Sequence, residues 1–186
     1  MKTIILAVLL FSVGVYSQPS RQQDTTNRDR SILSQRSQER IIKEVHHELV
    51  MLPFYGVFDN LAYQIAPDGT VTLLGQVSRP ALKSDAERAV RSIEGVERVV
   101  NNIQVLPTSP NDDRIRRETY RAIYGNEVLS QYQLRAIPPI HIIVDNGHLT
   151  LEGVVARQME KQIAETQAKS VPGVFSVMNN LKVENE

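Results

Sequence analysis

One stretch decides the fold, and it occurs twice: GTVTLLGQVSRPALKSDAERAVRSIEGVERVVNNIQV at residues 69–105 and GHLTLEGVVARQMEKQIAETQAKSVPGVFSVMNNLKV at residues 147–183. The copies align without a gap at an offset of 78 residues (147 − 69), and 16 of the 37 positions are identical. The identical positions include turn glycines, core aliphatic residues and a pair of adjacent asparagines. Such self-similarity predicts one small folding unit that is used twice.

The first copy begins with a predicted hairpin, whose strands cover residues 61–66 and 70–77. Its turn is Pro67-Asp68-Gly69, because proline presets the first turn position and glycine accepts a positive φ. A loop of three residues places Tyr63 and Ile65 on the same face as Val71 and Leu73. A loop of two residues would put a glutamine on that packed face, so we expect the longer loop.

A helix should begin at Pro80, where the missing N–H is harmless, and end before Gly95. Its apolar stripe is Leu82, Ala86, Ala89, Val90 and Ile93. A strand over residues 96–105 follows, and an amphipathic helix over residues 32–52 precedes the hairpin. Each unit therefore reads αββαβ. The strand–helix–strand step should be right-handed, which predicts an α+β fold: a three-stranded mixed sheet with both helices packed on one face.

The second unit repeats this order. Ser109 should cap its first helix, with Pro110 at the first helical position. Strands are expected over residues 140–144 and 148–155 around a turn at residues 145–147, followed by a helix over residues 157–171 and a strand over residues 174–183. We expect domains at residues 32–106 and 109–186 that pack against each other, because the linker is short.

The N-terminus has the three parts of an export signal. Lys2 is followed by an apolar run from Ile4 to Val15 and a small-residue cleavage pattern before Gln18. We expect residues 1–17 to be a cleaved signal peptide, which places the mature chain in the periplasm or outside the cell. Residues 18–31 lack any aliphatic side chain and are expected to form a flexible tether.

Composition excludes several classes of function. The chain has 21 basic and 21 acidic residues, so no overall positive field attracts nucleic acid. It contains no cysteine, which excludes disulfides, thiolate metal sites and a cysteine nucleophile. No phosphate-binding loop, serine-hydrolase or zinc-protease motif is present. We therefore expect no catalytic residues, no cofactor and no small-molecule substrate.

The four histidines do not predict a metal site. His46 and His47 are adjacent on a helix and point about 100° apart, so they are expected on the surface. The repeat places His141 at the position of Tyr63, on the packed face, and His148 at the rim of the turn. With a turn of three residues these two side chains point to opposite faces of the hairpin. A metal site needs three or four convergent ligands, so we expect none.

At this point the pattern resembles a known family. Two units of (D/N)G-x-(V/L)-T-L-x-G-x-V, an alanine-containing helix and GV-x-x-V-x-N-N-(I/L)-x-V are similar to the BON domain, named for bacterial OsmY and nodulation proteins. The resemblance covers most of the mature chain. It implies a small αββαβ domain of the bacterial envelope, associated with osmotic-stress protection, attachment to phospholipid surfaces, chaperone-like roles and outer-membrane integrity. It implies no catalytic residues.

One helix face is a candidate contact surface. If Ile115, Thr119 and Ala122 point inward, a step of 100° per residue places another set outward: Arg117, Tyr120, Arg121 and Tyr124. Tyrosines flanked by arginines suit a membrane–water interface or an aromatic-anchored protein contact. The alternative is an ordinary solvated face, or tyrosines buried against the other unit.

A second candidate surface lies on the strand over residues 140–144, which is apolar on both sides. A strand of that kind should be covered on both sides. We expect its outer side chains, Ile140, Ile142 and Val144, to meet the first unit or a partner.

Together these features predict a non-enzymatic exported envelope protein that binds a phospholipid surface or envelope partners. The alternative is a periplasmic chaperone or a protein adaptor without lipid affinity. The oligomeric state and the identity of the ligand stay open.

Overall fold

The computed structural model describes residues 22–184, and side chains from residue 36 onward. The expected signal peptide, residues 1–17, lies outside the described residues. Helix α1 spans Gln22–Val50, so it includes residues 22–31 of the stretch that we expected to form a flexible tether. No helix in the described part of the chain is long and apolar enough to cross a membrane.

The first module has the predicted order of elements after α1. Its elements are β1 (Asn60–Ile65), β2 (Thr70–Val77), α2 (Pro80–Arg91), β3 (Arg98–Asn101) and β4 (Gln104–Val105). β1 is antiparallel to β2, and β3 and β4 are parallel to it. The predicted loop of three residues is confirmed, because Tyr63 pairs with Leu73 and Ile65 with Val71.

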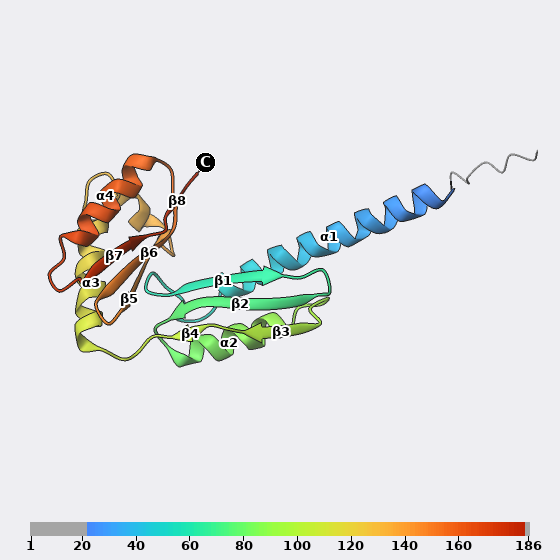
Figure 1. Ribbon diagram of the computed structural model, residues 1–186, viewed down its shortest axis with the longest axis horizontal. Helices are drawn as coiled ribbons and strands as arrows, with labels where there is room; N and C mark the ends of the chain where they lie inside the picture. The colour runs from blue at the N-terminus through green and yellow to red at the C-terminus, as the bar shows by residue number, and fades with distance from the viewer. Residues whose placement is uncertain (1–21, 185–186) are drawn as a thin grey trace, which may run out of the picture. The chain divides into compact units, whose positions relative to one another are not determined.

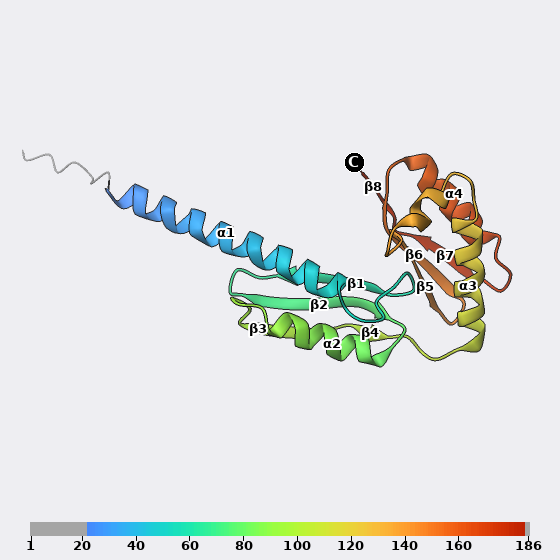
Figure 2. The ribbon, with the colours of Figure 1, turned by 180° about the vertical axis from the view of Figure 1, so that it is seen from behind.

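One apolar core fills the first module. The last turns of α1 supply Ile41, Val45 and Leu49, and α2 supplies Leu82, Ala86 and Val90. These side chains pack with Val71, Leu73 and Val77 of β2. Figure 2 shows the end of α1 and α2 on the same side of the sheet. The predicted arrangement of two helices on one face of a mixed sheet is confirmed.

The second module repeats this plan. It contains α3 (Pro110–Tyr124), the 3-10 helix η1 (Ser130–Leu134), β5 (Ile140–Asp145), β6 (His148–Val155), α4 (Gln158–Lys169), β7 (Ser176–Asn179) and β8 (Lys182–Val183). The sheet order is β5–β6–β7, with β8 also on β6, and α3 and α4 cover one face (Figure 1).

The paired asparagines explain why each predicted closing strand is split in two. Asn101 donates from Nδ2 to the Lys83 carbonyl at 2.8 Å, and its Oδ1 accepts from the Ile103 N–H at 3.2 Å. Asn179 makes the same bonds in the second module, to Lys161 and Leu181, at 3.0 and 3.3 Å. The side chain fastens the strand to the preceding helix and takes over a backbone bond that the sheet ladder would otherwise make.

The second hairpin differs from the prediction by one residue. Asp145 pairs with His148, so the turn has two residues, Asn146 at φ +50° and Gly147 at φ +79°. Asn-Gly with positive φ at both positions is the preferred two-residue hairpin turn. Relative to the first hairpin, a slip of one residue reverses the face that every side chain of β5 presents.

This slip corrects the prediction for Ile140, Ile142 and Val144. All three side chains are fully buried, and they lie in the core of the second module rather than on its outer face. Ile142 pairs with Leu151 and Val144 with Leu149, which are core residues of β6. The outer face of β5 carries His141 and Ile143 instead. The aligned repeat suggested a turn of three residues, and the local preference of Asn-Gly overrides it.

Candidate functional site

Helix α3 is positioned by its ends and its buried side. The Ser109 hydroxyl accepts the Asp112 N–H at 3.2 Å, which confirms the predicted cap. Arg114 then donates to Glu118 at 2.7 Å and to the Pro172 carbonyl at 3.1 Å, which fastens the helix to the segment after α4. Ile115, Thr119 and Ile123 are fully buried. The opposite side of the helix is therefore held toward solvent.

Three of the four residues expected on that outer side are found there. Arg117 and Arg121 are exposed, and Tyr120 is half-buried. Tyr124 was expected on the same side and is not, because it is only 2% exposed. Its hydroxyl donates to the Ile140 carbonyl at 2.7 Å and accepts the Ile140 N–H at 3.1 Å, and burial raises its pKa. The apolar side of α3 is wide enough to include this position beside Ile123.

The connection between α1 and β1, residues 51–59, also contributes to the site, and this was not predicted from the sequence. Within this segment, the Val57 carbonyl accepts a hydrogen bond from the Ile142 N–H at 2.8 Å. Phe58 packs edge-on against Tyr120, with ring centroids 6.3 Å apart and planes at 70°. The only sequence signal was the run of apolar and aromatic residues after Pro53, which is unusual for a solvated connection.

A buried carboxylate fixes this segment. Asp59 is 2% exposed, and its side chain accepts from the Gly56 N–H at 3.2 Å and from both the N–H and the hydroxyl of Ser78, at 2.7 and 2.8 Å. These bonds join the segment to the end of β2. The contact between this segment and β5 of the second module is therefore stabilised by hydrogen bonds inside the first module.

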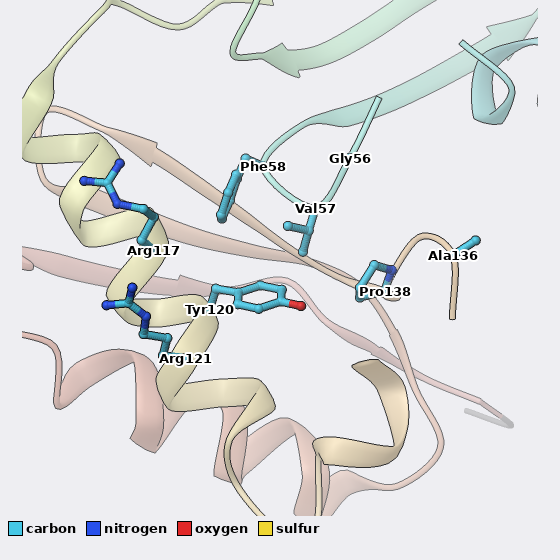
Figure 3. Close-up of a pocket in the computed structure, with 8 residues that line it drawn as sticks. All are labelled: Gly56, Val57, Phe58, Arg117, Tyr120, Arg121, Ala136 and Pro138. Atoms are coloured by element: carbon cyan, nitrogen blue, oxygen red, sulfur yellow. The ribbon is translucent and has the colours of Figure 1, made fainter. Parts of the chain in front are cut away.

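The two parts flank an open pocket of about 510 Å³. Its lining is Gly56, Val57, Phe58, Arg117, Tyr120, Arg121, Ala136 and Pro138. Figure 3 shows Tyr120 extending from α3 toward Pro138, with Phe58 and Val57 facing it. The two arginines lie at the end away from Pro138, and their guanidinium groups are turned outward from Tyr120. The Tyr120 hydroxyl accepts a hydrogen bond from Gln133 at 3.3 Å. The pocket is thus apolar along its length and cationic at one end.

The arginines of α3 differ in whether an acidic side chain pairs with them. Arg116 is 4% exposed and is committed to Asp113 at 2.5 Å and to the Val144 carbonyl at 2.6 Å. Within the described residues, neither Arg117 nor Arg121 forms an ion pair. A smaller neighbouring pocket shares Phe58 and Arg117 and adds Arg79. The Arg79 guanidinium lies 4.9 Å from the ring centre of Phe54, which is 71% exposed.

The histidines behave as structural residues. His46 and His47 are exposed, as predicted. His141 lies on the outer face of β5 and stacks on Tyr55 at 5.7 Å, which corrects the prediction that it faces the core. His148 is on the same outer face, not the opposite one, and contacts the Ser176 hydroxyl at 2.7 Å. Among the side chains described, residues 36–184, no cluster of three or more histidine or acidic residues could hold a metal.

Burial shifts the pKa of two residues at the contact. It lowers the pKa of His141, an effect that the nearby Asp59 and Glu152 only partly oppose. It also raises the pKa of Tyr55 to about 12. A neutral imidazole and a neutral phenol therefore stack where the segment meets β5.

Two further buried carboxylates hold parts of the second module together. Asp112 accepts the N–H groups of Asn146 and Gly147, at 3.0 and 2.9 Å. Glu160 accepts from the Tyr132 hydroxyl at 2.8 Å and from the Arg157 N–H at 3.0 Å.

Comparison with known proteins accounts for the repeated plan. The model of the BON domain matches twice, over residues 64–107 and 111–185. The chain belongs to the BON-domain family. It carries two BON domains in tandem, as the repeated stretch predicted.

One curated relative with this plan is osmotically-inducible protein Y of Escherichia coli (strain K12). It is 29% identical over 123 residues, which cover 61% of this chain and 57% of the relative. The chain therefore matches a little over half the length of that protein.

Two solved structures also match. Both are of CdsD, a structural protein of the type III secretion system of Chlamydia trachomatis, and the second is of its C-terminal domain. They share 14% and 13% identity and cover 78% and 77% of this chain and 94% and 96% of theirs. Both have a TM-score of 0.30, which is too low to support an argument.

Proposed function

We propose that this BON-domain protein is an exported, non-enzymatic component of the bacterial envelope, in the periplasm or secreted, that contacts a phospholipid surface through the outer side of α3. The observation that carries the proposal is the pair of exposed arginines, Arg117 and Arg121, which have no ion-pair partner among the described residues. They flank Tyr120 over an apolar pocket. Cationic side chains beside a tyrosine match the headgroup region of an anionic membrane.

The role in the envelope is proposed from the family and from the relative. The relative, osmotically-inducible protein Y, is named for its induction by osmotic change, and this chain contains two BON domains. We propose that membrane contact by this protein supports envelope integrity under osmotic stress.

Vesicle flotation tests the lipid contact. The chain should float with vesicles of phosphatidylglycerol and phosphatidylcholine at low salt, and not with phosphatidylcholine alone. Each basic side chain near an anionic surface contributes about 1 kcal/mol, so R117Q/R121Q should bind roughly tenfold or more weakly. The matched control is R88Q/R98Q, which removes two exposed arginines of the first module. Equal loss in both variants, or no flotation of the wild type, would reject the proposal.

A second candidate is a holdase, which binds unfolded client proteins. It is favoured by large apolar side chains in the open, with Phe175 77% and Met178 59% exposed near β7. Exposed apolar surface of this kind often marks a protein contact. Suppression of client aggregation by the wild type, lost in F175S/M178S, together with failure of flotation, would replace the lipid proposal by this one.

A further inference from the structure

We infer that the pocket between α3 and the segment at residues 56–58 binds one acyl chain that ends in an anionic group, with the chain along the pocket and the head group at Arg117 and Arg121. The inference rests on the proposed lipid contact and makes it more specific. It assigns the pocket to a free fatty acid, in addition to the headgroup contact that an open helix face could make.

The first argument is the size and chemistry of the pocket. A volume of about 510 Å³ lies within the range of roughly 300–1,000 Å³ that is typical of small-molecule sites. Its walls are side chains without charge: Val57, Phe58, Tyr120, Ala136 and Pro138. The Tyr120 hydroxyl is already hydrogen-bonded by Gln133. The side chains along this stretch are apolar apart from that hydroxyl, which can still donate its own proton.

The second argument is polarity along the pocket. Both guanidinium groups lie at one end, and Pro138 and Ala136 lie at the other (Figure 3). Neither arginine is neutralised by an ion pair in the described structure, whereas the adjacent Arg116 is paired with Asp113. A free guanidinium binds a carboxylate through charge-assisted hydrogen bonds. An amphiphile with one anionic end matches this distribution, and a neutral or cationic ligand does not.

The third argument is that the walls are held in place without a ligand. Asp59 fixes the segment from the first module, and the bond from Ile142 to Val57 fixes it to β5. The buried side of α3 fixes the other wall. A preformed site loses little conformational entropy on binding.

Calorimetric titration with dodecanoate, below its critical micelle concentration, is the direct test. We expect saturable binding of one molecule per chain. Decanoate should bind more weakly by about fourfold for each methylene removed, since a buried methylene contributes about 0.8 kcal/mol. Dodecanol, which lacks the charge, should bind at least tenfold more weakly than dodecanoate. R117Q/R121Q should weaken dodecanoate by a similar factor and leave dodecanol unchanged.

Two variants fill the pocket from different walls. Ala136 is exposed, and a Cβ added at Gly56 meets no atom within 4 Å, so A136W and G56F should both fold. Each should abolish dodecanoate binding, whereas the control A81W, at the exposed start of α2, should not. The readouts separate the two proposals, because flotation reports the headgroup contact and should survive A136W. Absent or non-saturable dodecanoate binding, or wild-type binding by both filled variants, would overturn the inference.

Discussion

Gly153 shows at the scale of one residue why the repeat preserves glycine inside a strand. Its φ is +121°, and a Cβ there would lie 1.9 Å from the Pro139 carbonyl oxygen. Gly75 has the same constraint, with φ +110° and the Asn60 oxygen at 2.1 Å. We expect G153A to lower the free energy of unfolding by at least about 2 kcal/mol, because strain and a backbone clash add. Urea denaturation measures this, and G56A, where space is open, should change it by less than about 1 kcal/mol.

His141 gives the chain a pH dependence with a definite sign. Burial lowers its pKa below the usual 6.5 in the folded protein, so the unfolded chain binds more protons as the pH falls below 6.5. The free energy of unfolding should therefore decrease from pH 7 toward pH 5. Asp59, Glu152 and Tyr55 lie near the ring, and backbone hydrogen bonds at Asp59 and Gly56, together with the two carboxylates, only partly oppose the effect on the pKa. Urea denaturation at several pH values should show a shallower decrease in H141Q, and an unchanged slope would contradict this assignment.

At the scale of elements, the repeat predicted the order of helices and strands because glycines, caps and apolar spacing act locally. It did not predict the register of the second hairpin, where Asn146-Gly147 selects a turn of two residues. One residue of slip changed the assignment of Ile140, Ile142, Val144 and His141 together. Aligning the two copies therefore predicts the order of helices and strands in the second module, but it does not predict the length of the hairpin turn.

A further repeat lies in the first helices and was missed because its offset differs. Arg40–Glu44 in α1 and Arg114–Glu118 in α3 are ion pairs 74 residues apart (114 − 40). Arg40 also donates to the Glu94 carbonyl, as Arg114 does to Pro172. The offset is four residues smaller than 78 because the connection after α3 is longer and contains η1. That longer connection supplies Ala136 and Pro138, two of the eight residues that line the pocket, and these two have no counterpart in the first copy.

The start of α3 and the second turn depend on one carboxylate. Asp112 is 1% exposed and accepts both turn N–H groups. D112A leaves one buried and one partly buried N–H donor without its partner and should lower the free energy of unfolding by roughly 2–4 kcal/mol. Thermal denaturation measures it, with D85A as the control, because Asp85 is half-buried on α2 and bonds only to the exposed Arg88 among the ion pairs found. Similar stability of the two variants would show that the turn holds without this bond.

At the scale of the whole molecule, the sequence predicted two domains with separate cores, and the structure has one core in each module. The sequence could not show that the connection after α1 reaches the second module. That contact depends on Asp59, a single buried acid in a connection where charged residues are ordinarily solvated.

Asp59 should therefore control the link between the modules. D59A removes three hydrogen bonds from the segment and should speed amide exchange at Ile142, which donates to Val57, by tenfold or more. The Asn180 amide, bonded to Leu151 within the second sheet, should exchange as in the wild type. Equal acceleration at both amides would mean global destabilisation and not a local release.

The bond between Val57 and Ile142 also bears on solubility. β5 is the terminal strand of its sheet, and it is rich in β-branched residues without a proline or a lysine to discourage pairing with a foreign chain. The bond from the Ile142 N–H to the Val57 carbonyl occupies one backbone donor on the open edge of β5. A strand of another molecule then has one donor fewer with which to pair there. Displacing the segment would expose the edge of β5 while both modules are still folded. Molecules would then aggregate through that edge before they unfold.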